Sequence, residues 1–282
     1  MSFFKQFPKT TYDLKRDGQL IEIRNIFRNV DVNERLIDPA SSYQYYEIKD
    51  GERPDLVSSK LYRSSNYYWT FFITNDHLKD GLQAWPLSYQ QLQRNIQKYY
   101  APYVVLELIP ESFRKINQYS NDITNLYLKG VGDDATTRTG RVYKVDNQRN
   151  QVWISDASTN LKNFAANNQG TFTQSGITCK GGSYSIHLRE DNSPAGTIID
   201  TGADTYYARE AFAAAWQAPV YYKDGSGNKI TIYDALTTGA TTNPTTWSEE
   251  LESENDKLRN IRVIKPEFIS EFVEQYKELI QS

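Results

Sequence analysis

The strongest constraint on the fold is a change of sequence pattern near Pro102 that is reversed near Thr246. Before Pro102, within residues 43–102, and again in the last helix, apolar residues recur every three or four places, which is the spacing of helices that pack on a core. Between Pro102 and Thr246, short runs rich in Val, Ile and Tyr are separated by Gly, Asn and Thr, as in strands joined by turns. The pattern predicts an α+β chain whose middle is a β-rich module, barrel-like or sandwich-like.

The same changes divide the chain into four parts. We expect an N-terminal arm over residues 1–42, a helical domain over 43–102, the β-rich module over 103–245, and a C-terminal strand and amphipathic helix over 246–282 that pack back on the rest. The last helix carries one apolar stripe, which we expect to lie on its own domain rather than on a partner.

The helical domain has the clearest local signals. A short strand is predicted over residues 45–48, and Pro54 then opens a helix, since proline is tolerated in the first turn of a helix. A second helix over 67–73 is apolar nearly all the way round, so it should be buried on more than one side. Ser88 caps a third helix over residues 89–99.

In the β-rich module, alternating residues around polar turns predict two hairpins, with strands at 141–145 and 151–155 and at 220–223 and 229–233. The alanine-rich run at 208–216 favours a short helix. The stretches around 160–182 and 236–246 are predicted to be loops.

Composition argues against two classes of partner. The chain has 282 residues, 24% of them charged, with a net charge of -3 and no basic run. Neither nucleic acid nor an anionic membrane surface would be attracted to such a chain as a whole. No stretch approaches the roughly 20 apolar residues that cross a bilayer, and the first residues lack the apolar core of a signal peptide. We expect no nucleic-acid partner, no membrane partner, and folding in a cytoplasm.

The residues that could carry chemistry do not form a catalytic or metal-binding set. The single cysteine, Cys179, is interpreted as a buried or inert thiol, because no histidine base stands in a defined relation to it. A glycosidase would need two carboxylates, one of them with a raised pKa. Four acidic residues are instead expected on solvated surface: Glu52, Asp55, Glu107 and Glu111. The acidic loops at 133–134 and 200–204 match no calcium-binding pattern. We expect no cofactor, no metal and no enzymatic activity.

Short motifs in the helical domain and near the C-terminus stand in a specific order. Glu52-Arg53-Pro54 follows the first turn, Tyr68-Trp69 lies in the second helix, and Asn75-Asp76 follows that helix. Trp85-Pro86-Leu87-Ser88 precedes the third helix, and residues 254–262 precede the last one. In this order the motifs resemble a LysM-type βααβ module and, more closely, the baseplate wedge protein fifty-three family of T4-like phages. The resemblance covers roughly residues 1–100 and 246–282.

The resemblance implies a structural subunit of a contractile phage-tail (myovirus) baseplate wedge, present in multiple copies and bridging neighbouring wedge proteins around the hub. The implied partners are other baseplate wedge proteins, with hub or sheath-initiator proteins also to be considered. The implied location is the virion, after assembly in the host cytoplasm. The β-rich middle is longer than in the short members of the family, which leaves its role open.

Two alternatives accompany this interpretation. LysM domains elsewhere bind polymers of N-acetylglucosamine, so a peptidoglycan-binding module of a tail protein is the alternative function. The aromatic content also has two explanations. The chain is 13% aromatic, with 21 Tyr and 5 Trp, and such residues are enriched both at protein interfaces and in β-structure. The residues expected at interfaces, some of which could instead be core, are Phe3, Phe4, Phe7, Tyr67, Tyr68, Trp69, Phe72 and Trp85.

Overall fold

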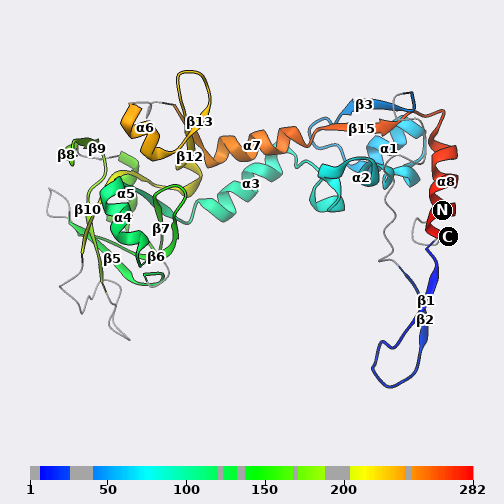
Figure 1. Ribbon diagram of the computed structural model, residues 1–282, viewed down its shortest axis with the longest axis horizontal. Coiled ribbons are helices and arrows are strands. Elements are labelled where there is room, and N and C mark those ends of the chain that lie inside the picture. Colours follow the sequence, from blue (N-terminus) through cyan, green and yellow to red (C-terminus); the bar gives the residue numbers. More distant parts are fainter. Residues whose placement is uncertain are drawn as a thin grey trace. The chain divides into compact units, whose positions relative to one another are not determined.

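The computed structural model describes residues 7–25, 41–119, 123–131, 137–167, 171–187, 204–238 and 243–281. Phe3, Phe4, the acidic pair at 133–134 and most of the loop at 200–204 lie outside these residues. The chain forms two compact units, coloured by sequence in Figure 1: unit 1 contains residues 1–91 and 253–282, and unit 2 contains residues 92–252. The boundaries between the units fall within helices α3 (Tyr89–Tyr100) and α7 (Trp247–Lys257).

Unit 1 is built around a two-stranded sheet whose strands come from opposite ends of the chain. Strand β3 (Tyr43–Glu47) pairs antiparallel with β15 (Asn260–Ile264) over five residue pairs. In unit 1, α1 (Pro54–Tyr62) and α2 (Thr70–Thr74) follow β3, and the whole of unit 2 lies in the sequence between α2 and β15. The core joins these elements through Ile48, Val57, Phe71, Leu78, Trp85, Ile261 and Val263.

The last helix, α8 (Ile269–Gln281), buries its apolar stripe within unit 1. Phe272, Val273, Tyr276 and Ile280 are buried in one cluster with Trp69 and with Phe7 from the N-terminal segment. Trp69 immediately precedes α2, whereas Phe71 belongs to the other cluster of unit 1. The predicted burial of the second helix on more than one side is therefore observed, although the α-helix is shorter than the predicted range.

Short elements complete unit 1. They are the strands β1 (Lys9–Tyr12) and β2 (Ile21–Arg24), which form a hairpin, and the 3-10 helices η2 (Ser65–Tyr67), η3 (Asp76–Leu78) and η4 (Gly81–Gln83). Among the helices of the described residues, none is both long enough and apolar enough to cross a membrane.

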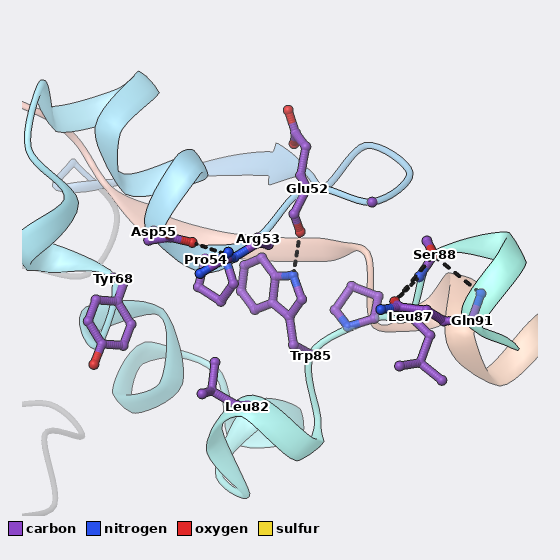
Figure 2. Close-up of a pocket in the computed structure, with 12 residues that line it drawn as sticks. Glu52, Arg53, Pro54, Asp55, Tyr68, Leu82, Trp85, Leu87, Ser88 and Gln91 are labelled. Atoms are coloured by element: carbon purple, nitrogen blue, oxygen red, sulfur yellow. Dashed lines mark hydrogen bonds and ion pairs between the residues drawn. The ribbon is translucent and has the colours of Figure 1, made fainter. Parts of the chain in front are cut away.

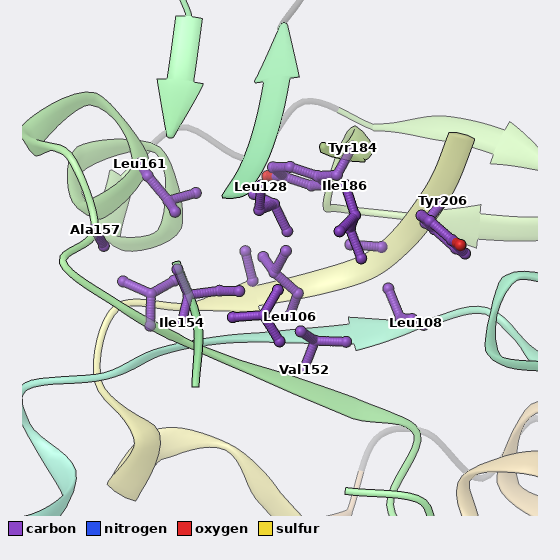
Figure 3. Packing of buried hydrophobic residues seen from close by; sticks show 14 of the residues in the cluster. Leu106, Leu108, Leu128, Val152, Ile154, Ala157, Leu161, Tyr184, Ile186 and Tyr206 are labelled. Atoms are coloured by element: carbon purple, nitrogen blue, oxygen red, sulfur yellow. The ribbon is translucent and has the colours of Figure 1, made fainter. Parts of the chain in front are cut away.

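Unit 2 contains a closed antiparallel barrel. Of the two architectures predicted for the β-rich module, barrel-like and sandwich-like, the first is therefore the one observed. Its strands, in spatial order, are β10 (Ser183–His187), β11 (Thr205–Phe212), β4 (Val104–Leu108), β7 (Gln151–Ser155), β6 (Thr137–Asp146) and β5 (Tyr127–Val131), and β5 pairs with β10 to close it. Alternate residues of β4 face the interior, where Leu106 and Leu108 pack with Leu128, Ile154 and Tyr184 (Figure 3). Helices α4 (Pro110–Asn117) and α5 (Thr159–Asn167) add Ile116 and Leu161 to this core.

Several smaller elements lie between the barrel strands or after them along the sequence. They are β8 (Phe172–Gln174) paired with β9 (Ile177–Cys179), the 3-10 helix η5 (Ala215–Gln217), helix α6 (Ile232–Thr238), and a sheet of β12 (Pro219–Lys223), β13 (Lys229–Ile230) and β14 (Pro244–Thr246).

The hairpin predicted at 141–155 is confirmed as β6 and β7, and the second is confirmed as β12 and β13, although α6 begins at Ile232. The predicted helix at 208–216 is wrong, because this run is mostly strand β11. Its small side chains Ala208 and Ala211 fill the barrel interior, and this packing overrides helix propensity. The predicted loops around 160–182 and 236–246 also contain α5, β8, β9, part of α6 and β14.

Candidate functional site

A groove of about 620 Å³ runs through unit 1 between the loop before α1 and the segment that leads into α3. Figure 2 shows the side chains that line it; they belong to residues 51–55, Tyr68, Leu82, residues 85–88 and Gln91. The groove combines an apolar wall with charged and amide groups at its rim, which is the usual make-up of a binding surface.

Trp85 fixes the loop before α1 against the core. Its indole N–H donates to the carbonyl oxygen of Glu52 at 2.7 Å, as drawn in Figure 2. Its ring lies against Phe71 and Phe72, with centroids 6.1 and 6.0 Å away. Only 7% of Trp85 is exposed, so most of its aromatic surface is already used inside unit 1.

Glu52 belongs to this loop, and its carboxylate accepts hydrogen bonds from three donors. The Tyr46 hydroxyl donates to it at 2.8 Å, the Lys49 amide at 3.0 Å, and the Lys60 ammonium also contacts it. Partial desolvation would raise the pKa of Glu52, but these donors, led by Lys60, outweigh that effect and lower the pKa. A carboxylate stabilised in its charged form is unsuited to act as a general acid near neutral pH.

Residues of the C-terminal segment tie the rim of the groove together. The Arg259 guanidinium donates to Asp50 and Asp256, each at 3.0 Å. The Asn255 side chain accepts from the Leu87 amide at 2.7 Å and donates to the Leu87 carbonyl at 3.0 Å. The hydrogen bond from the Tyr89 amide and the contact with Arg259 both lower the pKa of Asp50. Motif residues from the two ends of the sequence therefore meet at this rim.

Asn75 makes a second connection of the same kind. Its side-chain amide donates to the Arg262 carbonyl at 2.8 Å, and its oxygen accepts from the Arg262 amide at 2.8 Å. This pair of bonds extends the hydrogen bonding of β15 beyond its partner strand β3. Asn75, Asn255 and Arg259 thus have structural roles in holding β15 and α7 against the helices.

The interface residues that were expected from sequence and that the structure describes fall into two groups. Phe7, Trp69 and Trp85 are 4%, 8% and 7% exposed, so they are packed within the chain itself. Tyr67, Tyr68 and Phe72 are half-buried, and Tyr68 lines the groove. Sequence reasoning missed the apolar side chains of unit 1 that are most exposed, because single apolar residues in polar surroundings carry no periodic signal. These are Tyr45, Leu56, Leu82 and Tyr89, together with hairpin residues.

Unit 2 contains a charged cluster that contradicts one prediction. Glu107, expected on solvated surface, is 1% exposed. Its carboxylate contacts the Arg209 guanidinium and accepts from the Tyr222 hydroxyl at 2.9 Å. Burial raises the pKa of Glu107, and the contacts with Arg209 and Tyr222 oppose this rise. The β12 sheet, which supplies Tyr222, covers this outward-facing residue of β4. The uninterrupted apolar run around Glu107 was a signal that both faces of this strand are covered.

The geometry of β11 explains how Arg209 reaches Glu107. The register of β11 on β4 shifts between Ala208 and Glu210, which makes Arg209 the extra residue of a β-bulge. Bulges re-aim side chains at the edges of regular pairing. A pocket of about 260 Å³ adjoins the cluster, lined by Glu107, Tyr222 and residues of β12 and β13.

The remaining candidate residues do not assemble a reactive site in the described chain. Cys179 is buried, as the first of the two interpretations of this thiol expected. Asp55 pairs with Arg53 at 3.1 Å, and Glu111 accepts from Ser175. The described residues hold no group of three or more His, Cys, Asp or Glu side chains placed to bind a metal ion. The arrangement is suited to binding and to holding the fold together.

Comparison with known families identifies the N-terminal part. Residues 1–129 match the family described as Base plate wedge protein 53. The match spans the first segment of unit 1, with the groove-lining residues, and extends through β4 and α4 of unit 2. The C-terminal resemblance at 246–282 lies outside the matched residues. No curated protein matches the chain.

Proposed function

We propose that this chain is a structural subunit that joins neighbouring wedge proteins in a phage tail baseplate, because residues 1–129 match the base plate wedge protein 53 family. The family match carries the proposal. The matched residues include those that line the groove, so the match and the groove fall on the same part of the chain.

The side chains in the groove support a binding role without chemistry. Glu52 is held in its charged form by its donors, and Trp85 is committed to the carbonyl of Glu52. Leu82, in contrast, is 67% exposed at the groove and makes an apolar contact point for a partner. We infer that the chain is not an enzyme and that its partners are other wedge proteins, with hub or sheath-initiator proteins beside them.

The finer location follows from the family role. We infer a contractile tail of a myovirus-type virion, with several copies of the chain per baseplate and assembly in the host cytoplasm. Repeated copies would need at least two contact surfaces on each subunit. Exposed tyrosines such as Tyr45 and Tyr89, which combine a large ring with a polar hydroxyl, are suited to this use.

Co-expression with the other wedge proteins of the same phage tests the proposal. The chain should elute with them in a complex of defined mass by size-exclusion chromatography with light scattering. The variant Leu82→Ser should weaken that complex by about tenfold or more, the effect of losing one interface anchor. Leu56→Ser, which changes a leucine of unit 1 that is 51% exposed and does not line the groove, is the matched control and should leave the complex unchanged. A chain that elutes alone beside its assembled neighbours would refute the subunit role.

A second candidate function is peptidoglycan binding, which the resemblance to LysM modules and the groove between loop and helix favour. Sugar rings bind by stacking on exposed aromatic faces, whereas Trp85 is 7% exposed and its indole N–H already has an acceptor. Sedimentation with insoluble peptidoglycan separates the two candidates. Retention that soluble N-acetylglucosamine oligomers reverse, and that Leu82→Ser abolishes, would favour the glycan.

A further inference from the structure

The N-terminal hairpin, residues 9–24, has one apolar and one charged face. Its register pairs Thr10 with Ile23 and Tyr12 with Ile21, which places these four residues on one face. The other face carries Lys9 and Arg24 opposite each other, and Thr11 opposite Glu22. A salt bridge of 2.8 Å between Lys9 and Glu22 ties the two strands on the charged face.

Most of the apolar face is exposed in the part of the chain that the structure describes, although Ile23 is half-buried. Tyr12 is 55% exposed and Ile21 is 43% exposed, and Leu14 and Leu20, at the strand ends, are 67% and 68% exposed. No other helix or strand of unit 1 lies along the hairpin in Figure 1. A two-stranded hairpin is at best marginally stable in water unless its apolar face packs on something else.

The base of the hairpin is fixed, so its apolar face is presented from an anchored position. Phe7, two residues before β1, is buried in the cluster around α8. The Arg24 guanidinium donates to the Phe7 carbonyl at 2.8 Å, and the Asn25 amide donates to the Pro8 carbonyl at 2.9 Å. At the other end, Asp13 accepts from the Gly18 amide at 2.9 Å, which orders the turn.

The charges at the tip argue against a lipid partner. Asp13, Lys15, Arg16 and Asp17 lie between Leu14 and Leu20 or next to them, so the exposed leucines cannot enter a bilayer without the acidic side chains. The two acidic and two basic side chains cancel, so anionic lipid headgroups gain no net attraction, and desolvating the carboxylates is costly.

The size of the apolar face argues against a second copy as its occupant. A stable interface buries about 800 Å² on each partner. A face made of a few side chains from a short hairpin is too small to hold two copies together by itself. It suits a neighbour that other contacts already keep beside this chain.

We propose that the N-terminal hairpin is a docking arm that lays its apolar face on an apolar surface of a neighbouring baseplate subunit. The arm leaves Lys9, Glu22 and Arg24 in water at the rim of the contact. This inference rests on the proposed function and names one surface that performs it.

The experiment compares two hairpin variants of the full-length chain for binding to wedge complexes from the same phage, purified without this chain. Tyr12→Ser/Ile21→Ser changes the apolar face and should weaken binding by about tenfold or more, the loss of roughly 1.4 kcal/mol. Lys9→Ser/Glu22→Ser changes the charged face and should bind within about twofold of the wild type. Both variants should keep the melting temperature of the wild type, because the changed side chains are outside the core. If the first variant misfolds, Leu14→Ser/Leu20→Ser replaces it.

Each outcome has a distinct meaning. Equal binding of wild type and both variants would overturn the docking arm and leave the subunit role intact. Wild type that does not bind at all would overturn both proposals. Self-association of the chain alone that Tyr12→Ser/Ile21→Ser abolishes would show that the occupant is a second copy. Binding to phosphatidylglycerol vesicles lost in the same variant would show a lipid surface, and either result would overturn the proposal as stated.

Discussion

At the scale of single residues, the best-defined feature of unit 2 is the buried cluster of Glu107, Arg209 and Tyr222. A buried charge is tolerated when its partners satisfy it, and each member of this cluster contacts the other two. The cluster joins strands β4 and β11 of the barrel to strand β12. It therefore fixes the small sheet on the barrel more specifically than apolar contact alone would do.

Removing the Glu107 charge should destabilise unit 2 strongly. Glu107→Gln leaves the Arg209 guanidinium, whose side chain is 10% exposed, without its main counter-charge. We expect a loss of about 3–5 kcal/mol in the free energy of unfolding, measured with urea.

Glu210→Gln is the control for this change. It removes the other carboxylate near Arg209, at 3.0 Å, whose side chain is 24% exposed. Glu210→Gln should lower the free energy of unfolding by less than about 1 kcal/mol. Equal losses in the two variants would mean that the buried pair does not stabilise the fold in the way described.

At the scale of elements, the barrel depends on close pairing at the seam between β5 and β10. Gly130 lies opposite Tyr184 across this seam, and a Cβ atom at residue 130 would collide with the Tyr184 ring. The ring itself is 2% exposed in the barrel core, so it has little freedom to move away.

Gly130→Ala should therefore destabilise the barrel by about 1–3 kcal/mol through overpacking, measured by thermal or urea unfolding. Gly225→Ala offers a matched control in the turn between β12 and β13, where an added Cβ meets no atom within 4 Å. It should change stability by less than about 0.5 kcal/mol. A barrel that tolerates both changes equally would argue against the tight seam.

The elements that were predicted from the sequence are those whose signals lie within a short stretch of residues. The hairpin of β6 and β7 was predictable because its alternation and its turn are contiguous, and α1 because Pro54 marks its start. The pairing of β3 with β15 was not, since more than 200 residues separate Arg259 from the Ile48 carbonyl that it contacts. The strand at 205–212 was mistaken for a helix because alanines favour helices until a barrel interior requires small side chains.

The same distinction applies to the candidate site. The motif residues Glu52, Trp85 and Asn75 were identified through their order in the sequence, but their functions as ties within unit 1 required the structure. Glu107 was assigned to the surface because its partner Tyr222 is 115 residues away. A charge buried by a distant segment leaves little trace in the sequence around it.

At the scale of the whole molecule, unit 1 is assembled from the first 91 and the last 30 residues, and unit 2 occupies the sequence between them. The hydrogen bonds between Leu87 and Asn255 bring the two ends of unit 1 together where the chain leaves and re-enters it. Unit 2 is therefore carried between two segments of the chain that fold into one core.

The measurement that tests the central claim most directly is cross-linking mass spectrometry of intact phage tails. The account predicts cross-links from exposed lysines of unit 1, such as Lys60 and Lys79, to other baseplate wedge proteins. It also predicts that the chain is recovered from purified tails in multiple copies. Tails that lack the chain, or that contain it with no cross-link to any baseplate protein, would contradict the assignment as a wedge subunit.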